Sequence, residues 1–172
     1  MTVEELGTLY DYSYWANRKL FAVAASLTPD EFTRKVAGGW QSVRNTLVHM
    51  MSAEGGWLER AGGPPRGPAL NPDGFATLDA VTSYWAVQEG KVRAFLGGLT
   101  SADLARSREF TIPQLSLAGA LTIGEMLHHA VNHNIHHRGQ AVLLIRELGY
   151  APGNVDLLFY YGERRSMVNR ES

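Results

Sequence analysis

Five of the six histidines in the chain lie in one short stretch, from His128 to His137. Neutral imidazole is a good ligand for zinc, nickel, iron and other divalent ions, so this stretch is a candidate metal site. His133 and His137 are four residues apart, a spacing that places two side chains on one face of a helix, on successive turns. His129 lies one turn further back, whereas His128 and His136 turn toward solvent.

Two ligands do not complete a metal site, and the sixth histidine, His49, is the candidate for the third. Its neighbours on the same side of its predicted helix are small or polar, namely Asn45, Thr46, Ala53 and Gly56. Such neighbours fit a solvated surface histidine, and they equally fit a pocket that faces a second partner helix. In the second case His49, His133 and His137 form a three-nitrogen site with open positions for water.

Three imidazoles with open positions are the pattern of catalytic zinc sites, and nickel, iron or manganese also accept nitrogen ligands. The alternative for the whole cluster is a solvated helix face or an adventitious metal site. The chain has no cysteine, which excludes a disulfide framework, a thiolate nucleophile and a sulfur ligand. Any bound metal must therefore have nitrogen and oxygen ligands.

Two familiar metal patterns do not fit this sequence. A zincin has glutamate directly after the first histidine of its pair, whereas Asn134 follows His133 here, so no general base is built into the pair. A ferritin-like di-iron site needs two Glu-x-x-His motifs, and only the spacing from Glu125 to His128 matches. The mononuclear three-histidine site is what remains.

Four long segments with helical periodicity position these side chains. They cover residues 3–27, 42–60, 78–99 and 121–148. The last carries the histidine cluster; Thr122 with Glu125 forms a capping box at its start, and Gly149 ends it.

The connections between these helices are of very different kinds. Residues 61–74 contain four prolines and four glycines and predict a long loop across the end of a bundle. Residues 108–117 alternate briefly around Pro113, which is consistent with a short β-hairpin, and residues 155–164 predict a short helix. The whole pattern predicts an all-α, four-helix bundle and one domain over residues 1–172.

The charge and hydropathy of the chain narrow the function classes. At 172 residues the chain suits one domain, and its 16 basic and 17 acidic residues form no basic run. A protein that tracks nucleic-acid phosphates is therefore disfavoured. No apolar run approaches the length of a membrane span, and no signal peptide follows Met1, so we expect a cytoplasmic protein.

The histidine stretch also resembles a known family. His133-x-x-x-His137-Arg138-Gly139-Gln140 is similar to the signature of the DinB/YfiT-like proteins. Weaker similarities, in the same order along the chain, are Tyr14-Trp15-Ala16-Asn17, Leu47-Val48-His49, and Leu148-Gly149-Tyr150-Ala151-Pro152 with Asp156 following. The resemblance covers essentially the whole chain.

This resemblance implies a bundle in up-down-down-up order, a metal held by His49, His133 and His137, and a homodimer. Related members are thiol-dependent transferases or isomerases that use bacillithiol, mycothiol or glutathione. The family name records induction by DNA damage, which is not a DNA-binding activity.

Four further residues are candidates to orient the ligands or the substrate: Asn17, His129, Arg138 and Gln140. Gln140 lies on the same side of its helix as His133. Arg138 points elsewhere, which favours a role in packing or at an interface. Asn17 interrupts an apolar stripe, so we expect either a hydrogen bond to a neighbouring helix or a place near the metal pocket. Gly139 is expected to permit close approach of a helix.

Three functional hypotheses follow. The leading one is a metal-dependent enzyme on a small molecule, with transferase or hydrolase-like chemistry, and most plausibly a thiol S-transferase in stress response or detoxification. The second is a non-catalytic metal-binding stress protein, which the missing general base supports. The third is a helical dimerisation module whose histidines are only solvated.

Overall fold

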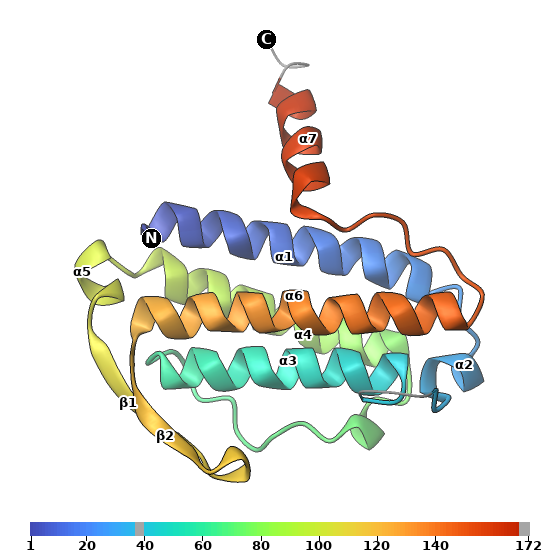
Figure 1. The fold of residues 1–172 in the computed structure, drawn as a ribbon, viewed down its shortest axis with the longest axis horizontal. Coiled ribbons are helices and arrows are strands. Elements are labelled where there is room, and N and C mark those ends of the chain that lie inside the picture. The colour runs from blue at the N-terminus through green and yellow to red at the C-terminus, as the bar shows by residue number, and fades with distance from the viewer. Residues whose placement is uncertain (37–39, 169–172) are drawn as a thin grey trace.

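Four long helices lie side by side and form the body of the protein (Figure 1). The computed structural model describes residues 1–36 and 40–168. The body consists of α1 (Val3–Ala24), α3 (Val43–Arg60), α4 (Leu78–Gly97) and α6 (Ile123–Glu147). Followed along the chain in Figure 1, α1 and α6 run one way, and α3 and α4 run the other. The predicted four-helix bundle and its up-down-down-up order are confirmed.

Short elements join these helices. They are α2 (Pro29–Thr33), η1 (Pro72–Gly74), α5 (Ser101–Leu104), β1 (Ser107–Ile112), η2 (Pro113–Leu115), β2 (Leu117–Thr122) and α7 (Leu157–Val168). The loop predicted at residues 61–74 is present and contains only the turn η1. The first helix ends at Ala24, because Thr28 and Pro29 start a separate capped helix, so the prediction that it reached residue 27 was wrong.

The hairpin before α6 is longer than the sequence suggested. Strands β1 and β2 pair antiparallel from Ser107 with Thr122 to Ile112 with Leu117, and Ser116 turns the chain with a left-handed φ of 51°. Thr122 ends β2 and also caps α6, with Glu125 completing the predicted capping box. The hairpin therefore leads directly into the helix that carries the histidines.

Apolar side chains of all four helices fill the centre of the bundle. On α3, Leu47, Met50 and Met51 are fully enclosed. α3 and α6 pack against each other along their lengths, so the two histidine-bearing helices form the most extensive helix pair. Their mutual position decides whether His49 reaches His133 and His137.

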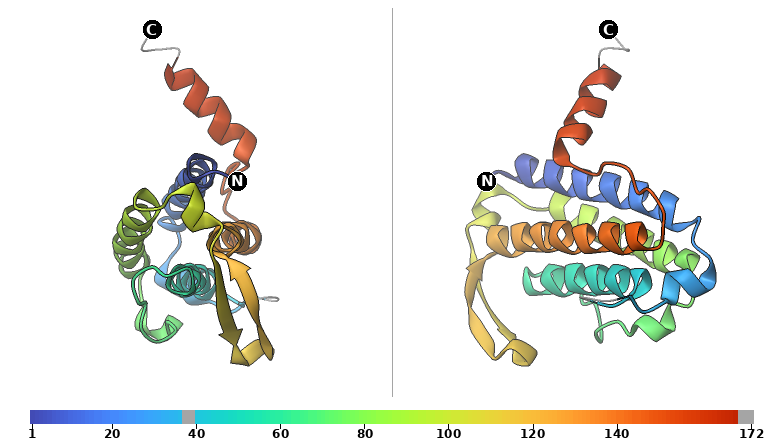
Figure 2. Two further views of the ribbon diagram at one scale, coloured as in Figure 1. Left: turned by 90° about the vertical axis from the view of Figure 1, so that its left-hand side faces the viewer. Right: turned by 45° about the vertical axis from the view of Figure 1, so that its right-hand side comes forward.

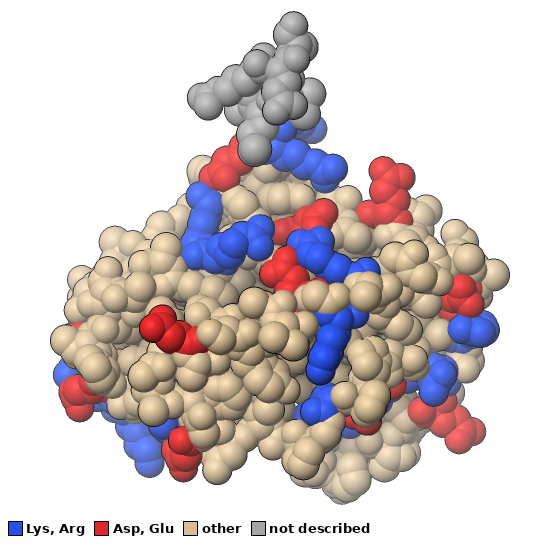
Figure 3. All heavy atoms as spheres, turned by 180° about the vertical axis from the view of Figure 1, so that it is seen from behind, with Lys and Arg blue, Asp and Glu red and all other residues tan. Residues whose placement is uncertain are grey.

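The surface carries charges of both signs. The face in Figure 3 shows acidic and basic side chains close to one another. Between α1 and α4, Arg93 bonds to both Asp11 and Glu89. None of the helices in the described part of the chain combines the length and the apolar character needed to cross a membrane.

Helix α7 projects from the bundle past α1 (Figures 1 and 2). Tyr160 packs edge-on against Trp15, and Glu163 accepts hydrogen bonds from Trp15 Nε1 at 2.7 Å and Lys19 Nζ at 2.6 Å. Leu158 and Phe159 are 72% and 48% exposed. One side of α7 is thus anchored to the bundle while another presents apolar side chains to solvent.

Candidate metal centre

The three histidines singled out from the sequence meet across the α3–α6 interface. His49 Nε2 lies 3.2 Å from His133 Nε2 and 3.1 Å from His137 Nε2, and the last two nitrogens are 3.1 Å apart. Nitrogen atoms bound tetrahedrally to one zinc ion at about 2.05 Å would be separated by about 3.3 Å. The three nitrogens are therefore spaced as ligands of a single ion require.

Burial keeps these imidazoles neutral. Desolvation, with a smaller contribution from the His137 charge, lowers the pKa of His49 to about 4 and that of His133 to about 3. Desolvation also lowers the pKa of His137, although its bond to Gln140 opposes this shift. A neutral imidazole has a lone pair available for a metal, so at neutral pH the three histidines are in the form that could bind one.

Two neighbours hold the histidine rings in place. Gln140 Oε1 lies 2.7 Å from His137 Nδ1, so this nitrogen donates to the amide and the Nε2 lone pair points into the cluster. The ring of His49 stacks on Trp40 at 3.9 Å between centroids. His133 Nδ1 is buried and has no hydrogen-bond partner among the described residues.

His129 lies beside the cluster rather than in it. Its ring centroid is 5.9 Å from that of His133, and its ring meets the edge of Trp57 at 4.5 Å. Both His128 and His136 are exposed, as the helical spacing indicated. His129 is thus an exposed neighbour of the cluster.

Arg138 has a packing role. Its side chain is buried and donates to Ser13 O and Ser13 Oγ, each at 3.0 Å, while its guanidinium lies over the ring of Tyr12. These contacts join α6 to α1, away from the three imidazoles.

Asn17 and Gly139 differ from what the sequence suggested. Asn17 is buried, but neither its Nδ2 nor its Oδ1 has a partner among the described residues, and it lines a hollow between α1 and α4 with Trp85. A hydrogen bond from this amide to a neighbouring helix is thus not observed. A Cβ at Gly139 would meet nothing within 4 Å, so close helix approach does not explain this glycine.

A buried carboxylate at the centre of the bundle was not predicted from the sequence. Glu54 of α3 accepts hydrogen bonds from Gln88 Nε2 at 2.9 Å, Asn134 Nδ2 at 2.9 Å and Tyr14 Oη at 3.4 Å. One donor thus comes from each of the other three long helices. Desolvation raises the pKa of Glu54 to about 7. Glu54 lies three residues after Met51 and four before Leu58, on the apolar face of α3. This spacing is the signal that could have revealed it.

Comparisons with known proteins point to one family. The model of the DinB family matches residues 1–166. Protein DinB of Bacillus subtilis (strain 168) is 25% identical over 159 residues, which cover 88% of this chain and 91% of that protein. Protein YizA of the same organism is 27% identical over 144 residues, which cover 83% of this chain and 87% of that protein.

Two solved structures share the fold. A DinB-like protein from Bacillus cereus ATCC 10987 superposes with a TM-score of 0.72 at 22% identity, covering 90% of this chain and 98% of its own. A conserved protein from Enterococcus faecalis gives a TM-score of 0.60 at 17% identity, covering 85% of this chain and 96% of its own.

Proposed function

The chain belongs to the DinB family, and from this membership and the geometry of its three histidines we propose that it is a metal-dependent enzyme acting on a small molecule. His49, His133 and His137 would hold one divalent ion, zinc being the best match, with nickel, iron or manganese as alternatives. The observation that carries the proposal is the triangle of Nε2 atoms with sides of 3.1 to 3.2 Å.

The reaction we propose is transfer of a low-molecular-weight thiol to an electrophile, in stress response or detoxification. A divalent ion held by the three histidines would lower the pKa of a thiol or a water bound to it. Gln140 selects the tautomer of His137, and Trp40 holds the ring of His49. His129 stands next to the cluster, within reach of a bound molecule.

One observation favours a second candidate function, a non-catalytic metal-binding stress protein. Within the described residues, the group that can hold a metal consists of histidines alone. The buried carboxylate Glu54 bonds instead to Asn134, on the core side of α6. A site without an adjacent carboxylate lacks the general base found in many hydrolases.

We also propose that two copies of the chain form a homodimer. The apolar side chains of Leu158 and Phe159 on the projecting α7 are exposed in the single chain. The outer face of α6 likewise exposes Ile135 and Leu143, on either side of Gly139. A second copy of the chain offers the same two surfaces, so a two-fold dimer buries them reciprocally.

The metal content of protein purified without an affinity tag tests the function. We expect about one divalent ion per chain, and its loss in His137→Ala, because two imidazoles bind a divalent ion much more weakly than three. His128→Ala is the matched control, since His128 is an exposed histidine on the same helix. Retention of metal by His137→Ala would exclude the proposed ligand set.

Activity separates the two candidate functions. The metal-loaded protein is assayed with bacillithiol, mycothiol and glutathione against a panel of electrophiles. Turnover that His137→Ala loses, while its circular dichroism spectrum is unchanged, supports the enzyme. Stoichiometric metal with no turnover across the panel supports the metal-binding protein. Absence of tight metal, with a melting temperature unaffected by chelator, leaves the dimerisation module.

A further inference from the structure

Two adjacent glycines lie inside α3, where each costs about 1 kcal/mol relative to alanine. The reason is space. A Cβ on Gly55 would lie 2.9 Å from Gln88 Oε1, and a Cβ on Gly56 would lie 3.0 Å from Arg60 Nη1 and 3.3 Å from Arg66 Cζ. The guanidinium groups of Arg60 and Arg66 therefore pack together against the backbone at Gly56.

These two arginines are only partly neutralised. Arg66 Nη1 donates to Ser52 O and Ser52 Oγ, each at 3.2 Å, and the nearest acid, Glu59, lies 3.8 Å from Arg66 Nε. Within residues 1–36 and 40–168, Arg60 donates only to carbonyl oxygens, and burial and the charge of Arg66 lower its pKa. Among the described residues, Arg60 Nε and Arg66 Nη2 have no hydrogen-bond partner. Two close cations with unused donors favour an anion.

The arginine pair is on the same side of α3 as the histidine cluster. His49 and Gly56 are seven residues apart, which is two helical turns and about 10 Å along the axis. Side-chain contacts connect the arginines to the histidines: Arg60 Cζ lies 5.3 Å from the centre of the Trp57 ring, and the Trp57 ring contacts His129. Arg60 Nη2 also reaches Thr111 O of β1, so the hairpin borders this region.

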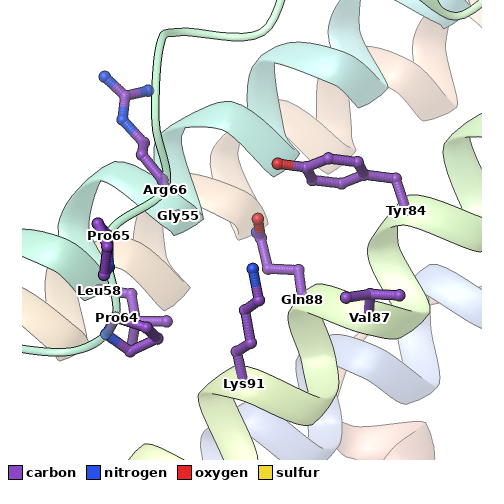
Figure 4. Close-up of a pocket in the computed structure, with 9 residues that line it drawn as sticks. All are labelled: Gly55, Leu58, Pro64, Pro65, Arg66, Tyr84, Val87, Gln88 and Lys91. Atoms are coloured by element: carbon purple, nitrogen blue, oxygen red, sulfur yellow. The ribbon is translucent and has the colours of Figure 1, made fainter.

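The guanidinium of Arg66 does not point into the small hollow nearby. That hollow, of about 40 Å³, lies between α3, the loop after it and α4, and Lys91 and Gln88 line it. Figure 4 shows the guanidinium of Arg66 pointing away from Lys91 and Gln88, with the base of the side chain at the rim. The charged end lies over Gly56 instead.

We propose that Arg60 and Arg66 form a carboxylate-binding subsite beside the three histidines. A guanidinium pairs with a carboxylate through two parallel N–H donors, and two of them select a carboxylate strongly over a neutral group. The subsite assigns the substrate class: a thiol that also carries a carboxylate, as the glutathione type does and mycothiol does not. This assignment of a thiol rests on the proposed function, whereas the anion subsite does not.

The subsite is tested with glutarate, a simple dicarboxylate, by titration calorimetry on the full chain. We expect glutarate to bind and its neutral diamide, glutaramide, not to bind. Arg60→Gln with Arg66→Gln should weaken glutarate binding by at least about tenfold, since both charged donors are lost. Arg146→Gln, an exposed arginine at the far end of α6, is the matched control and should bind as the unchanged chain does.

Folding is checked by circular dichroism, because Arg66 also ties the long loop to Ser52. If the double variant does not fold, Arg60→Gln alone is used and should still weaken binding several-fold. Failure of glutarate to bind the unchanged chain, or equal affinity in a folded variant, overturns the subsite.

His49→Ala separates this proposal from the proposed function. The variant should lose metal and still bind both glutarate and S-methylglutathione, whose blocked sulfur makes it a poor metal ligand. If His49→Ala binds them but the unchanged chain carries no metal and shows no turnover, the function fails and the subsite stands. If turnover is equally fast with mycothiol and in the folded arginine variants, the function stands and the subsite fails.

Discussion

At the scale of single residues, the tautomer of each imidazole decides whether its Nε2 can bind a metal. Three Nε2 atoms about 3 Å apart cannot all carry hydrogens, so at least one must present a lone pair to the centre. Gln140 is the group that sets one of these tautomers directly, through its 2.7 Å contact with His137 Nδ1. Groups that orient a metal-binding histidine in this way commonly change metal affinity when they are removed.

Gln140→Ala should therefore weaken metal binding by about 10- to 100-fold without unfolding the chain. Gln140→Glu, which keeps an acceptor at the same position, should retain most of the affinity. Competition with a chelating dye measures the dissociation constants. Equal affinity in the alanine variant would mean that the Gln140 contact does not orient His137.

Glu54 provides a second prediction at this scale. Its folded pKa of about 7 exceeds its usual value of 4.5, so the folded state favours the protonated form. The stability that this group contributes is complete below pH 4.5 and is lost as the pH rises through 7, by roughly 3 kcal/mol in total. Glu54→Gln removes this dependence, because an amide does not titrate.

The three histidines change the stability of the fold in the opposite direction to Glu54 as the pH rises, over an overlapping pH range. Their lowered pKa values mean that stability is present above pH 6.5 and is lost as the pH falls. The quantity to measure is thus the difference in unfolding free energy between Glu54→Gln and the unchanged chain, by urea denaturation of metal-free protein. As the pH rises from 5 to 8, the variant should become more stable relative to the unchanged chain. A difference that is constant with pH would contradict the raised pKa.

At the scale of elements, α6 serves several purposes because its faces meet different neighbours. His133 and His137 face α3, Arg138 crosses to α1, and Asn134 reaches Glu54 in the core. The β2 strand and the Thr122 cap fix where the helix begins. A shift of α6 by one residue would move all these groups at once, so its capping and the positions of His133 and His137 are coupled.

The glycines within helices give a prediction at the element scale. In α4, a Cβ at Gly90 would meet nothing within 4 Å, so Gly90→Ala should stabilise the fold by about 1 kcal/mol. Gly56→Ala should gain less, since its Cβ would press on Arg60 Nη1 at 3.0 Å. Urea denaturation measures both variants. An equal gain in both would show that the arginines move aside at no cost.

At the scale of the whole molecule, the projecting α7 is only partly packed against the bundle of a single chain. Tyr160 and Glu163 tie it to α1, yet Leu158 and Phe159 remain exposed. A dimer that buries these two side chains should dissociate on dilution. Leu158→Glu with Phe159→Glu should then be monomeric at concentrations where the unchanged chain is dimeric, because two charges would be buried unpaired.

Sedimentation velocity over a hundredfold range of concentration measures this equilibrium. Val87→Glu, an equally exposed apolar position on α4, is the control and should leave the dimer intact. A chain that is monomeric throughout, or a dimer that the α7 variant leaves unchanged, would exclude α7 as the dimer contact.

The local pattern of the sequence was enough to determine the bundle. Periodicity placed the four long helices, and Thr122 with Glu125 marked the start of the last one, because a capping box depends on residues only three positions apart. The spacing of His133 and His137 likewise placed two imidazoles on one face, since helical geometry is the same in every helix. These features need no knowledge of what packs against what.

Only the tertiary structure decided the rest, because contacts between distant segments depend on the rotation and offset of whole helices. Whether His49 was solvated or in a pocket was open until α3 was placed against α6. Spacing could place Glu54 on the apolar face of α3, but it could not name the partners of Glu54 or bring Arg60 and Arg66 together over Gly56, because those contacts join separate segments of the chain. The sequence by itself determined which elements form; packing determined which of their side chains meet.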